Sequence, residues 1–135
     1  MDILRRPSNK VPILVVDDDH DTADTAVLLL NYVGYEAVAA YGAEQAMSIA
    51  RVRFPRAVLL DLAMPGQDGL RLARDLRQLP GMNDAILICI TGYGQEHIHE
   101  SARQAGCNHV MLKPIEWSEL LPVLDQIGKP AAPGD

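Results

Sequence analysis

Carboxylates follow two of the most apolar runs of this sequence. The acidic triplet 17–19 comes directly after the run 13–16, and Asp61 comes directly after the run 57–60. Carboxylates that are crowded without cationic partners repel each other and have raised pKa values, so such a group is stable mainly when a divalent cation neutralises it. The residue types therefore predict chemistry assisted by a metal ion.

Two further apolar runs end in polar groups of other kinds. The run 85–90 ends at Thr91, and the run 110–112 ends at Lys113. If all four runs end at the same edge of the protein, an acidic cluster, a hydroxyl and an ammonium group converge there. Whether these groups converge depends on the secondary-structure elements that carry the four runs.

The four runs have the composition of strands that are buried on both faces. They contain almost no polar residue, as expected for a parallel sheet covered by helices on both sides. Longer segments with apolar residues at helical spacing alternate with these runs and with a weaker one, which gives five strand–helix units. Right-handed crossovers place every strand end on one edge, where open sheets of this kind bind ligands. An α/β, doubly wound fold is predicted, with its site at that edge.

The strands are expected at 13–16, 36–39, 57–60, 85–90 and 110–112, and the helices at about 21–33, 43–53, 68–78, 95–105 and 114–127. Asp21 is expected to cap the first helix, and Leu28 to be among its inward-facing residues. By domain, residues 1–12 are predicted to form an N-terminal extension, 13–127 a single globular domain, and 128–135 a flexible tail.

Composition excludes several classes of protein. A chain of 135 residues with 48% hydrophobic content is long enough for one continuous core. A net charge of −6 and a pI near 5.1 argue against direct binding to nucleic acid, which requires clustered Lys and Arg. No segment approaches the roughly 20 apolar residues that span a bilayer, so we expect a cytoplasmic protein without membrane insertion.

Some residues are expected to have structural roles only. Cys89 and Cys107 have neither the number nor the spacing of a disulfide framework or a metal site, and are expected to be reduced thiols. Arg71, Arg74 and Arg77 recur at helical spacing, and are expected to form a solvated helix face.

Four blocks of the sequence resemble the signature blocks of response-regulator receiver domains, and they occur in that family's order. The blocks are Val16-Asp17-Asp18, Leu60-Asp61 through Asp68-Gly69, Ile90-Thr91-Gly92 and Leu112-Lys113-Pro114. Any one block is weak support, since an apolar strand that ends in Asp is common. Four blocks in register make coincidence a poor explanation. The resemblance implies a flavodoxin-like (βα)5 fold with a five-stranded parallel sheet in the order 2-1-3-4-5.

The resemblance also implies a role for each residue of the acidic site. Asp61 is the expected phosphoacceptor, and Mg2+ is the expected cofactor because it prefers hard oxygen ligands and tolerates phosphate oxygens. Asp18, Asp61 and the backbone carbonyl of Ala63 would bind the ion directly, and Asp17 would act through a bound water. Lys113 would pair with the phosphoryl oxygens.

The same resemblance implies a conformational switch. Thr91 would donate its hydroxyl to the phosphoryl group and move its loop. This movement would change the surface made by the helix near 95–105, the strand 110–112 and the helix 114–127. Family members usually carry an aromatic residue where this chain has Val110, so the usual coupling is in question. Three alternatives stay open: Val110 only packs, Tyr93 or His109 takes over the signalling role, or the output depends mainly on the loop 92–94. The family pattern also predicts a cis peptide bond before Pro114.

The expected partners are a sensor histidine kinase or a histidine phosphotransfer protein as phosphodonor, and a downstream protein target. The expected activity is limited to the chain's own phosphorylation and dephosphorylation in a two-component phosphorelay, so it is not expected to be an enzyme. Two alternatives stay open: an interaction module of the same fold that is independent of phosphorylation, and a Mg2+-dependent phosphatase that forms an aspartyl phosphate. The segment 17–21 does not match the Asp-x-Asp-x-Thr motif of the latter class.

Overall fold

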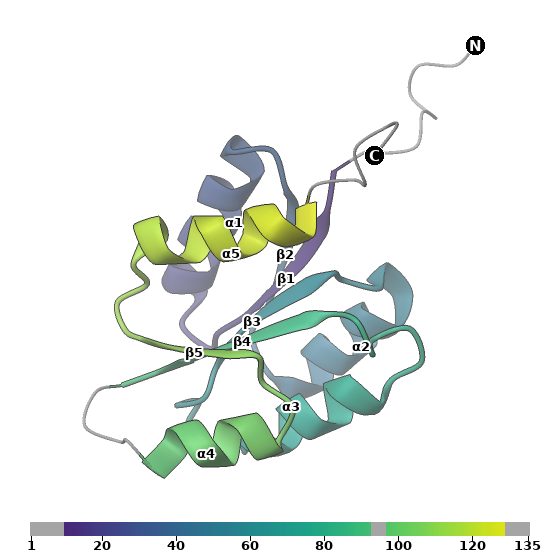
Figure 1. Ribbon diagram of the computed structural model, residues 1–135, viewed down its shortest axis with the longest axis vertical. Coiled ribbons are helices and arrows are strands. Elements are labelled where there is room, and N and C mark those ends of the chain that lie inside the picture. Colours follow the sequence, from purple (N-terminus) through teal and green to yellow (C-terminus); the bar gives the residue numbers. More distant parts are fainter. Residues whose placement is uncertain (1–9, 93–96, 129–135) are drawn as a thin grey trace.

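Five strands and five helices alternate along the chain in the computed structural model, which describes residues 10–92 and 97–128 (Figure 1). In chain order they are β1 (Pro12–Val16), α1 (His20–Tyr32), β2 (Glu36–Ala40), α2 (Ala43–Arg53), β3 (Ala57–Asp61), α3 (Gly69–Gln78), β4 (Ile86–Thr91), α4 (His97–Gln104), β5 (His109–Leu112) and α5 (Trp117–Gly128). All strand pairs are parallel, and the sheet order is β2-β1-β3-β4-β5. The predicted fold class and strand order are confirmed.

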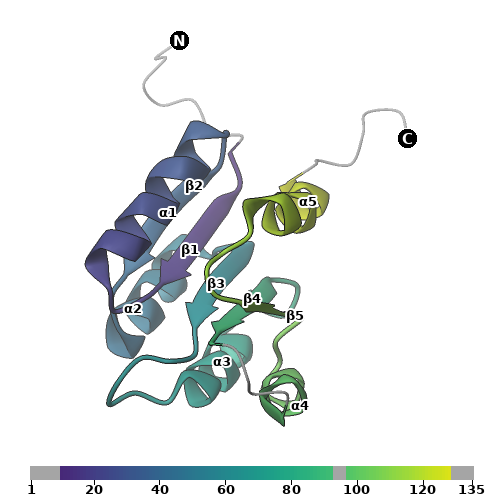
Figure 2. The same cartoon turned by 90° about the vertical axis from the view of Figure 1, so that its left-hand side faces the viewer.

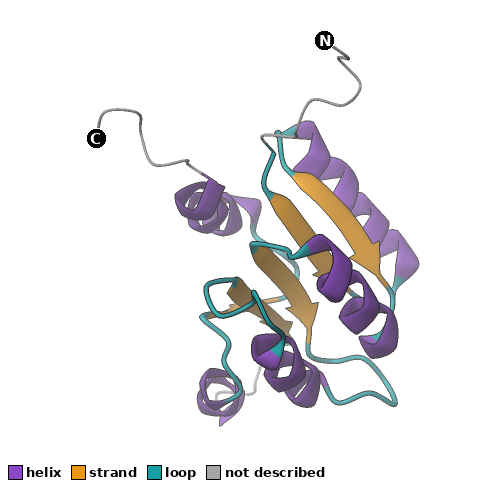
Figure 3. Cartoon of the chain, turned by 90° about the vertical axis from the view of Figure 1, so that its right-hand side faces the viewer, coloured by secondary structure: helices purple, strands orange, loops and turns teal. Residues whose placement is uncertain are grey.

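Helices cover both faces of the sheet, as Figures 1 and 2 show. The helices α1 and α5 lie on one face, and α2, α3 and α4 lie on the other. Alternate residues of each central strand belong to the two layers: Leu14 and Val16 pack toward α2, α3 and α4, whereas Val15 packs toward α1 and α5. This alternation explains why the central strands are apolar throughout. Figure 3 shows the same three-layer arrangement by element type.

The helix boundaries differ from the predicted ones by one to three residues in most cases. The first helix begins one residue earlier than predicted, because the Asp19 carboxylate accepts hydrogen bonds from the backbone N–H groups of Asp21 and Thr22. Asp19 is therefore the N-cap, and the prediction of Asp21 is wrong. Leu28 was predicted to face inward but is 70% exposed, because the buried positions of α1 are Ala23, Ala26 and Leu30.

The loop that follows β3 is fixed at both of its ends. Asp68 caps α3 by accepting hydrogen bonds from the N–H groups of Leu70 and Arg71. A Cβ atom on Gly69 would lie 2.8 Å from the Leu62 Cα atom, so the close approach at this point requires glycine. The loop beside Asp61 is thereby held in one path over the sheet edge.

Some predictions concern the ends of the chain. The predicted N-terminal extension and C-terminal tail fall mainly on residues 1–9 and 129–135, which lie outside the described residues. The domain limits of 13 and 127 stay a prediction. Among the described residues, no helix is long and apolar enough to cross a membrane.

The two cysteines are joined by a disulfide bond, so the prediction of reduced thiols is wrong. Cys89 lies on β4 and Cys107 follows α4, with 6.3 Å between their Cα atoms. Because 18 residues separate them in the sequence, their contact depends on how α4 returns to the sheet, which local spacing does not reveal.

The prediction of a solvated row of arginines is also wrong for Arg77. Its guanidinium donates hydrogen bonds of 2.7–3.2 Å to the carbonyl oxygens of Met82, Asn83, Ala85 and Gly106, and one of 2.9 Å to the Asn108 side chain. A half-buried cation with five acceptors joins the end of α3 to two loops. It acts as a structural crosslink at the edge of the sheet opposite to the acidic residues.

Replacing Arg77 with Met should lower the free energy of unfolding by about 2 to 4 kcal/mol, because backbone carbonyls lose a charged donor. The control is Arg71→Met. The Arg71 side chain is 78% exposed and reaches Asp75 at only 4.0 Å, so its loss should cost less than about 0.5 kcal/mol. Urea unfolding of the two variants measures the difference, and equal losses would contradict the role given to Arg77.

Candidate functional site

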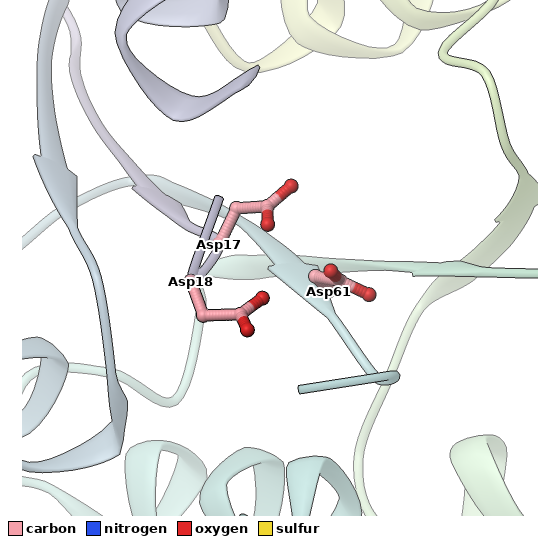
Figure 4. A group of neighbouring side chains, drawn as sticks. All are labelled: Asp17, Asp18 and Asp61. Atoms are coloured by element: carbon pink, nitrogen blue, oxygen red, sulfur yellow. The ribbon is translucent and has the colours of Figure 1, made fainter. Parts of the chain in front are cut away.

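Three carboxylates meet at the carboxyl ends of two neighbouring strands. Asp17 and Asp18 follow β1 and Asp61 ends β3, and one ligand oxygen from each lies within 4.8 Å of the others (Figure 4). The pairing of β1 with β3 brings the ends of the two strands to the same level. The acidic cluster predicted from the sequence is therefore present, with Asp17 and Asp61 buried and Asp18 exposed.

Both oxygens of Asp61 have hydrogen-bond donors. Lys113 Nζ lies 2.8 Å from Oδ2, and the backbone N–H of Ala63 donates to Oδ1 at 2.8 Å. The Asp61 side chain is only 3% exposed, whereas that of Lys113 is 40% exposed. Burial alone lowers the pKa of Lys113, but its hydrogen bond to Asp61 and the charge of Asp61 raise the pKa more, so the ammonium form is secured.

One positive charge does not balance three carboxylates. Burial and the negative charge of Asp61 raise the pKa of Asp17 to about 6, although the backbone N–H of Asp19 donates to its carboxylate at 3.0 Å. The site thus holds more negative charge than its own residues neutralise, which is the condition expected of a divalent-cation site.

The set of ligands fits a small, hard cation. Mg2+ prefers octahedral oxygen coordination, keeps several bound waters and needs only one or two carboxylates from the protein. The three carboxylate oxygens, all within 4.8 Å of one another, lie close enough for such an ion to bind among them directly or through its waters. All three donors are oxygens, and the ammonium of Lys113, 2.8 Å from Asp61, cannot bind a metal while it is protonated.

A cleft of about 810 Å³ opens over these residues. Asp17, Asp18, Asp61, Ala63 and Lys113 all line it, whereas Thr91 is not among its lining residues. Its other walls include side chains that sequence reasoning did not assign to the site: Thr22, Thr25 and Ala26 of α1, and Ile115 and Trp117 near the start of α5. The helical spacing of Thr22, Thr25 and Ala26 after the acidic triplet is the signal that could have placed them there.

Thr91 ends β4 and is 4% exposed. It lies beside the end of β5, where Thr91 pairs with Leu112 and its carbonyl accepts a hydrogen bond of 2.9 Å from the backbone N–H of Lys113. The peptide bond between Lys113 and Pro114 is cis, as predicted. The predicted hydroxyl and ammonium groups are therefore on adjacent strand ends at the edge that carries the carboxylates.

The other two predicted switch positions differ in what the structure describes. Val110 is half-buried on β5 and pairs in register with Cys89. Tyr93 lies outside the described residues. Gln67 was not predicted: its side-chain oxygen accepts a hydrogen bond of 2.5 Å from the N–H of Ala43, and so ties the loop after Asp61 to the start of α2. That contact joins residues 24 apart, and no local pattern signals it.

Comparison with known proteins gives the family. The sequence profile of the response regulator receiver domain matches residues 13–125. The chain belongs to this family. It is thus a receiver domain of two-component systems, and receiver domains generally use Mg2+ at a cluster of acidic residues like the one described above.

Relatives and solved structures agree with this assignment. The receiver domain is 33% identical over 117 residues to an uncharacterised 14.6 kDa protein of Leptolyngbya boryana, covering 87% of this chain and 89% of that protein. It is 31% identical over 123 residues to the phosphate regulon transcriptional regulatory protein PhoB of Pseudomonas aeruginosa, covering 91% of this chain but only 54% of PhoB. A putative response regulator from Chloroflexus aurantiacus is 30% identical with a TM-score of 0.79, covering 88% of this chain and 98% of that one. A CheY-like receiver domain from Methanospirillum hungatei is 25% identical with a TM-score of 0.80, covering 88% and 94%.

In the absence of divalent cations, the acidic site should destabilise the protein increasingly as pH rises. The pKa of Asp17 is 3.8 in its ordinary state and about 6 when folded. Between these values the folded protein binds more protons than the unfolded chain, so the contribution of Asp17 to the free energy of unfolding falls as pH rises. Asp17→Asn should therefore gain stability relative to wild type between about pH 4 and pH 6, and hold that gain above it.

Urea unfolding at several pH values in the presence of a chelator measures this difference. Asp21→Asn, an exposed acid in the first turn of α1, is the control and should show no such gain. Adding Mg2+ at neutral pH should stabilise wild type more than Asp17→Asn. A difference between Asp17→Asn and wild type that stays constant over the whole pH range would show that Asp17 carries no excess proton affinity.

Proposed function

We propose that Asp61 accepts a phosphoryl group from the phosphohistidine of a sensor histidine kinase or a histidine phosphotransfer protein. The observation that supports this proposal is the position of Asp61. It is a buried carboxylate close to two further carboxylates and one ammonium group, in the lining of a cleft. A group in this position can react with a partner's side chain that enters the cleft, while the surrounding charges bind the transferred group.

In the proposed transfer, an oxygen of the Asp61 carboxylate attacks the phosphorus atom, and the bond between phosphorus and the imidazole nitrogen breaks. The imidazole leaves with the electron pair of that bond and takes up a proton. The product is an acyl phosphate on Asp61. Lys113, already 2.8 Å from Asp61, binds a phosphoryl oxygen as a point charge, and the Thr91 hydroxyl donates to another oxygen.

Mg2+ is the proposed cofactor, and when bound it offsets the negative charge that the carboxylates and the phosphoryl group bring together. Asp18 and Asp61 are its proposed carboxylate ligands, with the backbone carbonyl of Ala63 as a third protein ligand. Asp17 acts through a bound water.

The proposed output is a change in the surface of α4, β5 and α5. Thr91 and Lys113 are joined through their backbones, so movement of either toward a phosphoryl group displaces the ends of β4 and β5 together. Val110 fills a space on β5 where it packs against the core, and it offers no ring to swing. Docking of a downstream protein at this surface, in the cytoplasm and without direct contact with nucleic acid, is the proposed response. The chain then acts as a switch and does not turn over an external substrate.

Incubation with phosphoramidate and Mg2+ should add one phosphoryl group to the protein, which intact mass spectrometry detects. Asp61→Asn should remove the adduct. Asp68→Asn is the matched control, since it changes an acid of the same loop but retains a good helix cap. The absence of an adduct on wild type would favour an interaction module that does not depend on phosphorylation. Continuous turnover of a phosphomonoester would favour a phosphatase.

Replacing Lys113 with Ala should separate metal binding from phosphoryl transfer. Loss of a charged donor to the transferring group should slow phosphorylation by phosphoramidate by about 100-fold. Affinity for Mg2+ should stay equal or increase, because removing a cation 2.8 Å from Asp61 removes a repulsion from the metal. Trp117 lines the cleft, so its fluorescence can report a Mg2+ titration. A collapse of Mg2+ affinity in this variant would contradict the role given to Lys113.

A further inference from the structure

The disulfide bond joins two parts of the proposed switch. Cys89 lies on β4, two residues before Thr91, so both side chains are on the face of the sheet that α3 and α4 cover. Cys107 lies in the segment 105–108 between α4 and β5, which we call the α4–β5 corner. The bond therefore attaches the carboxyl end of α4 to the strand that carries Thr91.

The bond also lies beside the unusual switch position of β5. Val110 is the register partner of Cys89 in the pairing of β4 with β5, and both belong to the same core layer. Where other receiver domains are expected to have an aromatic side chain, this chain has a small residue next to a covalent crosslink. The crosslink thus lies between the strand that carries Thr91 and the carboxyl end of α4.

The α4–β5 corner does not depend on the disulfide alone. Arg77 donates hydrogen bonds to the carbonyl of Gly106 and to the side chain of Asn108, at 2.7 and 2.9 Å. The Asn108 side chain also accepts the N–H of Leu87 at 2.9 Å, and its own N–H donates to the Leu87 carbonyl at 2.8 Å. Reduced cysteines behave as small apolar side chains, which suits this buried layer. The fold is therefore expected to persist when the bond is broken.

We propose that Cys89 and Cys107 are a reversible redox modification site that regulates the phosphorylation of Asp61; this proposal rests on the proposed function. Cys107 is 6% exposed and Cys89 is fully buried, so reagents reach the sulfur of Cys107 first. A thiolate of an external dithiol attacks that sulfur, the S–S bond breaks, and Cys89 leaves as a thiolate that takes up a proton. The second thiol of the dithiol then releases Cys107, so the dithiol is oxidised and both cysteines are reduced.

The position of the crosslink determines which redox state favours phosphorylation of Asp61. The Cα atoms of the two cysteines are 6.3 Å apart, close to the upper limit of about 6.8 Å for a disulfide. Any rearrangement that moves α4 away from β4 at this point is therefore blocked while the bond exists. The bond favours the present arrangement over a displaced one, and reduction removes this bias. By reciprocity, phosphorylation favours the dithiol form to the same extent.

The test compares two preparations of the full chain, one in reduced dithiothreitol and the other in its cyclic disulfide. Alkylation under denaturing conditions followed by intact mass spectrometry gives the redox state. Phosphoramidate with Mg2+ gives the rate of phosphorylation. The reduced protein should be phosphorylated faster, and it should bind beryllofluoride with Mg2+ more tightly by about fivefold or more, within the usual range of coupling between two sites. Beryllofluoride with Mg2+, which imitates the phosphoryl group, should shift the redox equilibrium toward the dithiol by a similar factor.

Cys89→Ala and Cys107→Ala are the controls, and both should react at the rate of the reduced protein in either buffer. A response to the redox buffer in these variants would assign the effect to some other part of the chain and overturn the proposal. Failure of an excess of the cyclic disulfide to oxidise the wild-type pair would also overturn it. Equal rates for the two redox forms of wild type would overturn the coupling and leave the proposed function standing. Absence of phosphorylation in both forms would overturn the proposed function and the coupling together.

Discussion

The site depends on a surplus of negative charge that the fold itself creates. The strands β1 and β3 are buried and parallel, so their last residues must emerge at the same point, and those residues are carboxylic acids. Lys113 neutralises one of them at 2.8 Å, and burial together with the charge of Asp61 raises the pKa of Asp17. The carboxylates cannot move apart, because the hydrophobic layers on both faces of the sheet fix the positions of β1 and β3. The binding of a divalent cation follows from this constraint.

Sequence patterns predicted the features of this fold that depend on neighbouring residues, and they missed contacts between distant segments. Apolar runs that end in Asp17, Asp61, Thr91 and Lys113 identify strands and their ends, and parallel topology then brings those ends together without knowledge of any side-chain contact. Contacts that join distant segments have no such signal. Arg77 has the helical spacing of a solvated residue, yet its acceptors lie in loops 5 to 31 residues away. Even the local cap was misplaced, since Asp19 and Asp21 are equally good capping residues by type, and only the path of the chain after β1 selects Asp19.

The two faces of the sheet differ in the residues that lie near the site. On one side, the cleft is lined by Thr25 of α1, by Trp117 of α5 and by Ile115, which precedes α5. On the other side, α3 and α4 pack against the strand positions that include Cys89 and Val110. The cleft that gives access to the phosphoacceptor and the core layer that contains Cys89 and Val110 thus lie on opposite faces of one sheet. The helix α5 is common to the cleft and to the proposed output surface.

The carboxyl end of α4 is the more firmly held end among the residues the structure describes. The segment 105–108 is held by three sets of contacts: hydrogen bonds from Arg77, the paired hydrogen bonds between Asn108 and Leu87, and the disulfide. If Thr91 moves, the end of α4 nearest to it can respond only by rotation about this segment or by breaking contacts within it. Of these contacts, the disulfide alone can be made and broken chemically under mild conditions without losing a backbone hydrogen bond. The covalent bond is therefore the point at which the range of motion of α4 can be altered while the fold is kept.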